Sequence, residues 1–359
     1  MANNLHRQRG KEQRVTHGVM KVVFLLAFLL ITSASAYALR LYFVARDSIG
    51  QTFTGKSANA VANFSDQRPI SILLLGVDTG AEGRIDKGNS DTMIVATINP
   101  KTKKTLLVSI PRDTAAQLIG TRQFNMQKVN AAYNVGSSTM AKNTISKLLN
   151  IPINYYVTVN MGGMEQIVNA VGGIDVDVPF SFTSHYTGGQ HFTKGPMHLN
   201  GNMALAYARM RHEDVQKGDY GRQERQQQVI KAVLSKAISM NGITHFTALL
   251  KSISGNLSTD LSFDDMVGIF SHYRGAAKTV STDTLHGQNA LVQTPEYSFP
   301  LAYQVAGTSE LQRVSDKTRE SLGLSKEALV NAETQQNAKN PNFKFNATYN
   351  QNYTIFNLP

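Results

Sequence analysis

The chain has 359 residues, of which 42 % are hydrophobic and 17 % are charged. That composition supports a full-sized core and excludes a disordered or repeat protein. The absence of cysteine excludes disulfides, thiol catalysis and cysteine-based zinc sites. The net charge of +11 would suit a nucleic-acid ligand, but residues 1–46 alone hold seven Lys or Arg against one Glu. We therefore predict a basic cluster that flanks a membrane, and no nucleic-acid partner.

Residues 22–39 form an uncharged apolar run between basic residues, long enough to cross a bilayer as a helix. The apolar character continues to Val44, which favours a retained anchor with a cytoplasmic N-terminus and an extracellular remainder. The alternative is a cleaved signal peptide, because Ala34 to Ala36 resembles a cleavage site. The N-terminal part is divided into a basic cytoplasmic segment over 1–21, a single transmembrane helix over 22–44 and a polar linker over 45–68.

A folded domain is predicted over residues 69–324. Ile70 to Val77 is a short continuous apolar run, typical of a strand buried on both faces. Residues 92–98 and 105–110 predict two further strands, which a turn-forming pentad joins into a hairpin. Beyond them, helices are predicted at 140–149 and 164–171, and strands at 154–159 and 174–178. This alternation predicts a three-layer α/β/α domain, in which the hairpin makes the central sheet mixed.

The C-terminal half is predicted to be mainly helical. Helices are expected at 223–240, at 245–253, at 266–273 behind a Ser262/Asp265 capping box, and at 309–322, with short strands and turns over 284–303. From Ser325 to Pro359 the chain contains eight Asn and little apolar periodicity. We expect this last segment to be a loosely ordered external tail.

An arginine-rich stretch precedes and opens the long helix. Arg209, Arg211, Arg222 and Arg225 lie within 17 residues, and the last two share the helical stripe that becomes apolar from Val229 onward. Guanidinium groups on a stripe that faces the core need an anionic partner, because uncompensated buried charge is costly. The other interpretation is a solvated helix end. Four arginines beside an acidic loop favour an anion-binding site.

Two carboxylates are predicted at one edge of the sheet. Asp78 closes the first strand and Asp91 opens the second, where ligands of open α/β sheets usually bind. Such a pair, with room for water and phosphate oxygens, suits Mg²⁺, although aspartates at strand ends also often cap turns. Arg112 would project to the same edge, and with Arg84 and Lys128 the set fits a pyrophosphate. No nucleotide-binding motif is present, so the anion is not predicted to be ATP or NAD.

These motifs resemble the LytR-CpsA-Psr family of Gram-positive cell envelopes. The matching segments are ILLLGVD, SDTMIVATINP, LLVSIPRD, KVNAAY, GGIDVDV and ALAYARMRHED…GDYGRQERQQQVI. They span about residues 70–235, and weaker similarity continues to about 324. The resemblance implies an extracytoplasmic enzyme that transfers a polyprenyl-pyrophosphate-linked glycopolymer, such as teichoic acid or capsular polysaccharide, to peptidoglycan through a phosphodiester. The alternatives are a non-catalytic regulator of envelope assembly that binds polyprenyl phosphates, and a lipid pyrophosphatase.

The resemblance also implies roles for single residues. Asp78 and Asp91 match the family's Mg²⁺-associated carboxylates, and the pyrophosphate and head-group contacts match Arg112, Arg209, Arg211, Arg222 and Gln226. Further motif positions, which we assign to substrate binding, are Arg84, Lys128, Asp219 and Arg225. The apolar helices after Gln226 and the segment from Ile145 to Ile153 are candidates to line a groove for the prenyl chain. Either Asp78 or Asp91 would assist deprotonation of the acceptor.

Overall fold

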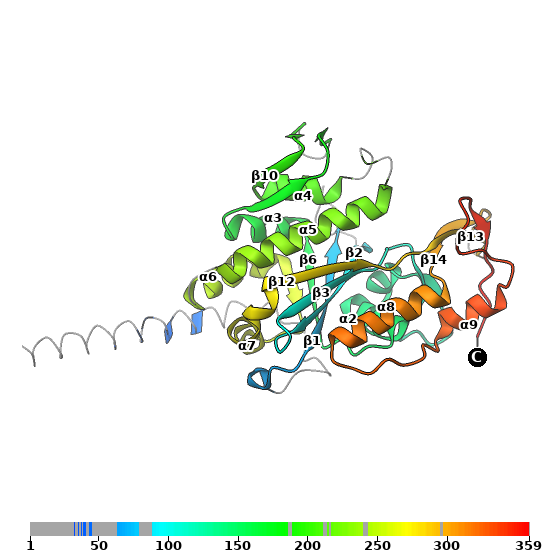
Figure 1. Cartoon of the computed structure of the whole chain (residues 1–359), viewed down its shortest axis with the longest axis horizontal. Coiled ribbons are helices and arrows are strands. Elements are labelled where there is room, and N and C mark those ends of the chain that lie inside the picture. Colours follow the sequence, from blue (N-terminus) through cyan, green and yellow to red (C-terminus); the bar gives the residue numbers. More distant parts are fainter. Residues whose placement is uncertain are drawn as a thin grey trace, which may run out of the picture.

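The computed structural model describes residues 63–78, 88–185, 189–210, 214, 217–239, 243–294 and 297–358, together with seven residues between 32 and 44. Its centre is a six-stranded sheet with the order β11-β6-β1-β2-β3-β12. The strands are β1 (Ile70–Val77), β2 (Ser90–Asn99), β3 (Lys104–Ser109), β6 (Tyr155–Asn160), β11 (Leu257–Thr259) and β12 (Thr279–Thr284). Figure 1 shows this sheet crossing the middle of the molecule.

The central sheet is mixed, as predicted. Strand β1 runs parallel to β6 and β3 runs parallel to β12, whereas β2 is antiparallel to both of its neighbours. The predicted β2–β3 hairpin is therefore confirmed. Because β1, β3 and β6 point the same way, their carboxyl ends meet at one edge of the sheet, where β2 begins.

Helices pack on both faces of the sheet, because alternate strand residues point to opposite sides. On one face, Leu73 and Val95 join a core with α2 (Ala131–Leu149) and α8 (Thr308–Ser321). On the other face, Ile72 packs with residues of α6 (Ile243–Ile253) and α7 (Phe263–Tyr273). This second face is also covered by α5 (Gly218–Ser239), through Ile230. The sheet is thus shielded from water on both sides (Figure 1).

A smaller substructure packs against α5 around Val229 and Val233 and has its own core. It consists of α3 (Met161–Ala170), β7 (Ile174–Val178), β8 (Phe182–Thr183), β9 (His191–Phe192), β10 (Gly195–Leu199) and α4 (Gly201–Arg209). Strand β7 pairs with β10 and β8 pairs with β9, all antiparallel. The core of this substructure includes Val229 of α5. It therefore holds α4 in a fixed position beside α5.

Helix α2 begins nine residues before the predicted start at 140. It contains a break, since Gly136 and Ser137 have non-helical backbone angles. Because of this break, the apolar residues before it and after it do not follow one continuous helical repeat. The repeat therefore becomes clear only near Met140. The capping box of Ser262 and Asp265 at the start of α7 is confirmed.

The expectation of a loosely ordered tail after residue 325 is wrong. Helix α9 (Ala332–Lys339) packs beside α8, and β15 (Gln351–Asn352) extends the sheet formed by β13 (Gln288–Val292) and β14 (Leu301–Val305). The amide side chains that suggested disorder are used internally. Asn337 donates to the carbonyl of Ala306 at 3.0 Å and accepts from the hydroxyl of Tyr353 at 2.8 Å. An Asn-rich composition indicates disorder only where the amides face water.

The N-terminal predictions fall mostly on residues outside the described ones. These are the cytoplasmic segment 1–21, most of the helix 22–44, and positions 45–62 of the linker. Over the part of the chain that the structure describes, no helix combines the length and apolarity that a membrane crossing requires. The end of the predicted linker is folded: Phe64 in η1 (Phe64–Asp66) is buried and contacts the rings of Tyr155 and Tyr273. The folded part therefore begins a few residues before position 69.

The buried carboxyl of Glu333 in α9 is expected to make the free energy of unfolding depend on pH. Its carboxylate is buried and accepts a hydrogen bond from the backbone N–H of Gln117 at 2.8 Å. Burial raises the pKa of this carboxyl above its ordinary value of 4.5, although the hydrogen bonds from backbone N–H groups act to lower it. The folded state then binds more protons than the unfolded chain at pH values between the two pKa values, so the free energy of unfolding falls as pH rises through that window.

We expect Glu333→Gln to remove this fall, because the amide keeps the acceptor for Gln117 without the ionisation. Urea denaturation of both proteins between pH 4.5 and pH 8 measures it. Equal pH slopes for wild type and variant would contradict the assignment.

Candidate active site

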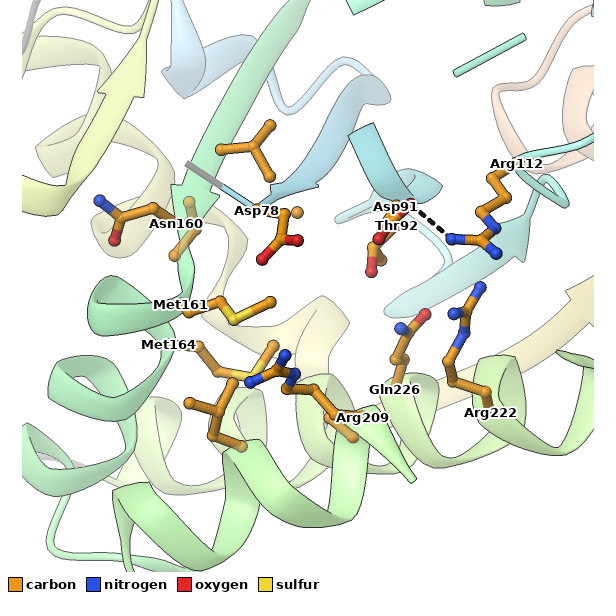
Figure 2. A pocket seen from close by; sticks show the side chains of 15 residues that line it. Asp78, Asp91, Thr92, Arg112, Asn160, Met161, Met164, Arg209, Arg222 and Gln226 are labelled. Atoms are coloured by element: carbon orange, nitrogen blue, oxygen red, sulfur yellow. Dashed lines mark hydrogen bonds and ion pairs between the residues drawn. The ribbon is translucent and has the colours of Figure 1, made fainter. Parts of the chain in front are cut away.

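A polar cavity of about 200 Å³ lies at the sheet edge where β1 and β6 end and β2 begins. One wall is formed by the strand ends and the others by α3, α4 and α5. The predicted site residues that line the cavity are Asp78, Asp91, Arg112, Arg209, Arg222 and Gln226. Figure 2 shows their side chains around one space. The structure thus brings together residues that are up to 148 positions apart in the chain (226 − 78).

Asp91 owes its orientation to an irregularity in the sheet. Gly76 is opposite Thr92 and Val77 is opposite Ser90, so Asp91 is the extra residue of a β-bulge. Bulges redirect side chains and often lie next to active sites. Gly76 is needed here, because a Cβ atom at this position would lie 2.8 Å from the Cβ of Thr92. Any larger residue would separate the two strands and displace Asp91.

Arg112 follows β3 and is held by two acids. Its Nη1 donates to Oδ1 of Asp91 at 2.8 Å, and its Nε lies 3.7 Å from Oδ2 of Asp113. Burial acts to lower the pKa of the Arg112 guanidinium, but the hydrogen bond to Asp91 and the charges of Asp91, Asp113 and Asp219 raise it above its usual value. Arg112 therefore stays charged, and its direction is set before any ligand arrives.

Two more arginines reach the cavity from the helices. Arg209 is the last residue of α4, and Arg222 lies in the first turns of α5, one helical turn before Gln226. The Nη2 of Arg222 is 2.5 Å from Oδ1 of Asp219, in a pair that is mostly buried. In Figure 2 both guanidinium groups point from their helices toward the strand ends. Three guanidinium groups from three elements therefore face one small cavity.

The other predicted site residues do not line this cavity. Asp219, three residues before Arg222 in α5, pairs with the Arg222 guanidinium. Lys128 lies 2.9 Å from Oδ1 of Asp113, and Asp113 in turn contacts Arg112. Arg84 and Arg211 lie outside the described residues.

Arg225 is almost fully buried, away from the cavity lining. Its Nη1 is 2.8 Å from Oδ2 of Asp214, and its Nη2 donates to the carbonyl of Met210 at 2.6 Å. Gly221 makes room for this pair, because a Cβ there would lie 2.0 Å from Asp214. Arg225 thus fastens the connection between α4 and α5.

Sequence reasoning missed Asp113 and Asn160. Asp113 bridges Arg112 and Lys128, and its position directly after Arg112 was a usable signal. Asn160 ends β6, lines the cavity and caps α3 by accepting from the N–H of Gly163 at 2.8 Å. It pairs with Val77 and so lies beside Asp78 at the same edge of the sheet, which the alternation of strands and helices could have revealed.

The donor set fits Mg²⁺. Asp78 and Asp91 line the same cavity, and Mg²⁺ is usually held by one or two carboxylates with water and substrate phosphates completing its shell. Within the described ranges, no group of three or more His, Asp or Glu residues could hold a metal by itself.

An apolar cavity of about 220 Å³ lies between the sheet and α5, α6 and α7. It adjoins the polar one along α5, because Gln226 lines the polar cavity and Ile230 and Leu234, at the next i+4 positions, line the apolar one. Strand β1 shows the same transition, from Leu74 in the apolar cavity to Gly76 in the polar one. The expectation that Ile145 to Ile153 forms such a groove is wrong, because that segment packs in the core on the opposite face of the sheet.

Comparison with known proteins identifies the family. The model of the LytR_cpsA_psr family matches residues 38–319, and the chain belongs to this family. The resemblance seen in the sequence is confirmed.

Individual relatives cover most of the chain. The polyisoprenyl-teichoic acid–peptidoglycan teichoic acid transferase TagU of Enterococcus faecalis is 39 % identical over 306 residues, which cover 85 % of this chain and 97 % of the relative. Biofilm regulatory protein A of Streptococcus mutans is 35 % identical over 336 residues, which cover 88 % of this chain and 80 % of the relative. The solved structure of TagT bound to LIIa-WTA matches with a TM-score of 0.60 and 27 % identity, covering 76 % of this chain and 98 % of that one.

Proposed function

We propose that the protein is a membrane-anchored extracytoplasmic phosphotransferase. It moves a glycopolymer from a polyprenyl-pyrophosphate carrier to peptidoglycan and leaves a phosphodiester. The observation that carries the proposal is the succession of the two cavities along α5, the first lined by three arginines and two aspartates and the second by apolar side chains. A lipid pyrophosphate has the same division into an anionic head and an apolar chain. The transferase named among the relatives supports the same assignment.

In the proposed reaction, a muramic-acid hydroxyl of peptidoglycan attacks the phosphorus that bears the sugar. The bond from that phosphorus to the bridging oxygen breaks, and polyprenyl phosphate leaves with the bridging oxygen. Arg112, Arg209 and Arg222 bind the phosphate oxygens and offset the charge that builds up during transfer. Asp91 and Asp219 hold Arg112 and Arg222 in position through the pairs described above.

The hydroxyl proton passes to one of the two cavity carboxylates, Asp78 or Asp91. Mg²⁺, held by the same two residues, supplies further charge neutralisation when bound. The proposed anchor is the apolar run over 22–44, and the basic residues before it favour a cytoplasmic N-terminus.

Filling the apolar cavity should weaken binding of the prenyl chain that we place there. Ala237→Trp places an indole in this cavity and displaces at least two methylene groups of the chain, each worth about 0.8 kcal/mol. We expect the KM for a long-chain donor to rise about tenfold, while a short-chain donor is unaffected. Lys231→Trp, on the exposed face of the same helix, is the control. An equal rise for both chain lengths, or none, would contradict this site.

Reconstitution tests the proposal as a whole. The full-length chain in mild detergent is mixed with Mg²⁺, a lipid-pyrophosphate glycan and peptidoglycan oligomers. Covalent glycan on the acceptor, lost on chelation of Mg²⁺, is the expected result. Phosphate release without transfer would identify a lipid pyrophosphatase instead. Binding without turnover would identify a regulator, the second candidate, which the name of the Streptococcus mutans relative favours.

A further inference from the structure

A second polar groove, of about 610 Å³, lies apart from the candidate active site. It is enclosed by the β13–β14 hairpin, by residues near β5 (Met126–Lys128), which pairs with β4 (Ala115–Gln117), and by the end of the chain. Its polar and aromatic lining includes Asn125, Gln127, Gln293, Tyr297, Tyr303 and Asn357. Asn357 and its neighbour Ile355 lie beyond the family match, which ends at residue 319. This groove is therefore built partly from the segment that is additional to the family domain.

The lining side chains that the structure describes are uncharged, which limits the ligand class. Of the described residues that line the groove, none is acidic or basic, although the chain carries a net charge of +11. The candidate active site is the opposite, with three arginines and two aspartates in a smaller volume. A polyanion would find no counter-charge among these lining side chains. A neutral ligand rich in hydroxyl or amide groups matches it.

Two features suit a sugar chain. Tyr297 in the lining is 49 % exposed and adjoins Phe299, which is 58 % exposed, with ring centroids 5.6 Å apart. The electron-rich faces of such rings attract the C–H faces of pyranose rings.

The polar groups of the groove complement hydroxyl and acetamido groups. Gln127 uses Nε2 to donate to Oδ1 of Asn125 at 3.0 Å, which leaves the amide N–H groups of Asn125 and the carbonyl of Gln127 for a ligand. The hydroxyl oxygen of Thr294, also in the lining, is buried and has no hydrogen-bond partner among the described residues.

The wall from the C-terminal segment is rigidly held. Gln336 bonds to both the carbonyl and the N–H of Phe356, at 2.5 and 3.0 Å, and Asn340 does the same to Thr354, at 2.9 and 3.0 Å. These pairs fix the backbone next to Ile355 and Asn357. The groove is therefore a built feature of the fold.

The groove is also linked to the candidate active site. Lys128 lies 5.6 Å from the ring centroid of Tyr303, which lines the groove, and 2.9 Å from Asp113. Asp113 in turn contacts Arg112, which lines the active-site cavity. The groove is thus connected to Arg112 through Lys128 and Asp113.

We propose that this groove binds the neutral N-acetylhexosamine backbone of the acceptor glycan and positions its hydroxyl for transfer. The inference rests on the proposed function for the identity of the acceptor, whereas sugar binding itself does not. The uncharged side chains described in the lining favour this neutral ligand over the phosphate-rich donor polymer.

Binding of chito-oligosaccharides to the full-length chain, measured by calorimetry, tests the proposal. We expect binding that weakens about tenfold in Tyr297→Ala and in Gln127→Ala. Tyr349→Ala, which removes another exposed tyrosine outside the groove lining, should bind as wild type does. Stem peptide and polyglycerol phosphate serve as the two competing ligand classes. Binding of either in place of the sugar, or unchanged sugar affinity in both groove variants, would overturn the proposal.

Kinetic measurements distinguish a failure of this inference from a failure of the proposed function. In the transfer assay, Tyr297→Ala should raise the KM for the acceptor and leave the KM for the lipid donor unchanged. An equal rise in both would overturn the acceptor role. Sugar binding without any transfer by wild type would refute the proposed function and leave the groove's ligand class standing.

Discussion

Replacement of Arg112 by alanine is expected to lower the rate of glycan transfer by at least about 10²-fold, the usual cost of removing one preorganised donor to developing charge. Its guanidinium faces the cavity already aimed by Asp91 and Asp113. The fold should persist, because these two acids are about one-third exposed and water can solvate them. Asp91→Ala is expected to abolish transfer as well, since it removes a carboxylate of the cavity and releases Arg112.

Transfer by the purified variant, with its melting temperature recorded alongside, measures the effect. Arg122→Ala removes an exposed arginine of a surface turn and serves as the control. Arg112→Lys keeps the charge without the planar fork and should fall between the two. Wild-type turnover in both Arg112→Ala and Asp91→Ala would refute the assignment of the site.

Replacement of Arg225 by alanine is expected to act on stability. The variant leaves the carboxylate of Asp214 buried without its partner, which costs about 3–5 kcal/mol when a buried pair is broken. For a domain of this size the melting temperature should fall by about 10 °C. The rate of transfer per folded molecule should stay close to that of wild type, because Arg225 does not line the cavity.

Thermal denaturation followed by circular dichroism measures this loss. The double variant Asp214→Leu/Arg225→Met removes both charges and should recover most of the lost stability. A stable Arg225→Ala protein without transfer activity would instead place Arg225 in the substrate site.

The contrast between Arg222 and Arg225 shows what the sequence could predict. Helical periodicity correctly put both on the buried side of α5, and it correctly followed the stripe from Arg222 through Gln226 to the apolar residues. The pattern does not show which group faces each arginine. Arg225 follows Arg222 by three residues, so its side chain leaves the helix in a different direction and meets Asp214 instead of the cavity. The loop that carries Asp214 has no periodicity from which its path could be predicted.

The strand-end residues were predictable for a simple geometric reason. Asp78 and Arg112 follow buried parallel strands, whose carboxyl ends meet at one edge. The bulge that turns Asp91 into the cavity left no clear sequence signal except Gly76, because bulges depend on register between two strands. The tail after Ser325 was mispredicted because composition records how many amides are present and not what they bond to.

A crystal structure with a soaked polyprenyl pyrophosphate and Mg²⁺ tests the central claim most directly. We predict the pyrophosphate within hydrogen-bond distance of Arg112, Arg209 and Arg222, the metal at Asp78 and Asp91, and the prenyl chain along α5 past Ile230. A pyrophosphate bound elsewhere, or a prenyl chain outside the apolar cavity, would contradict it.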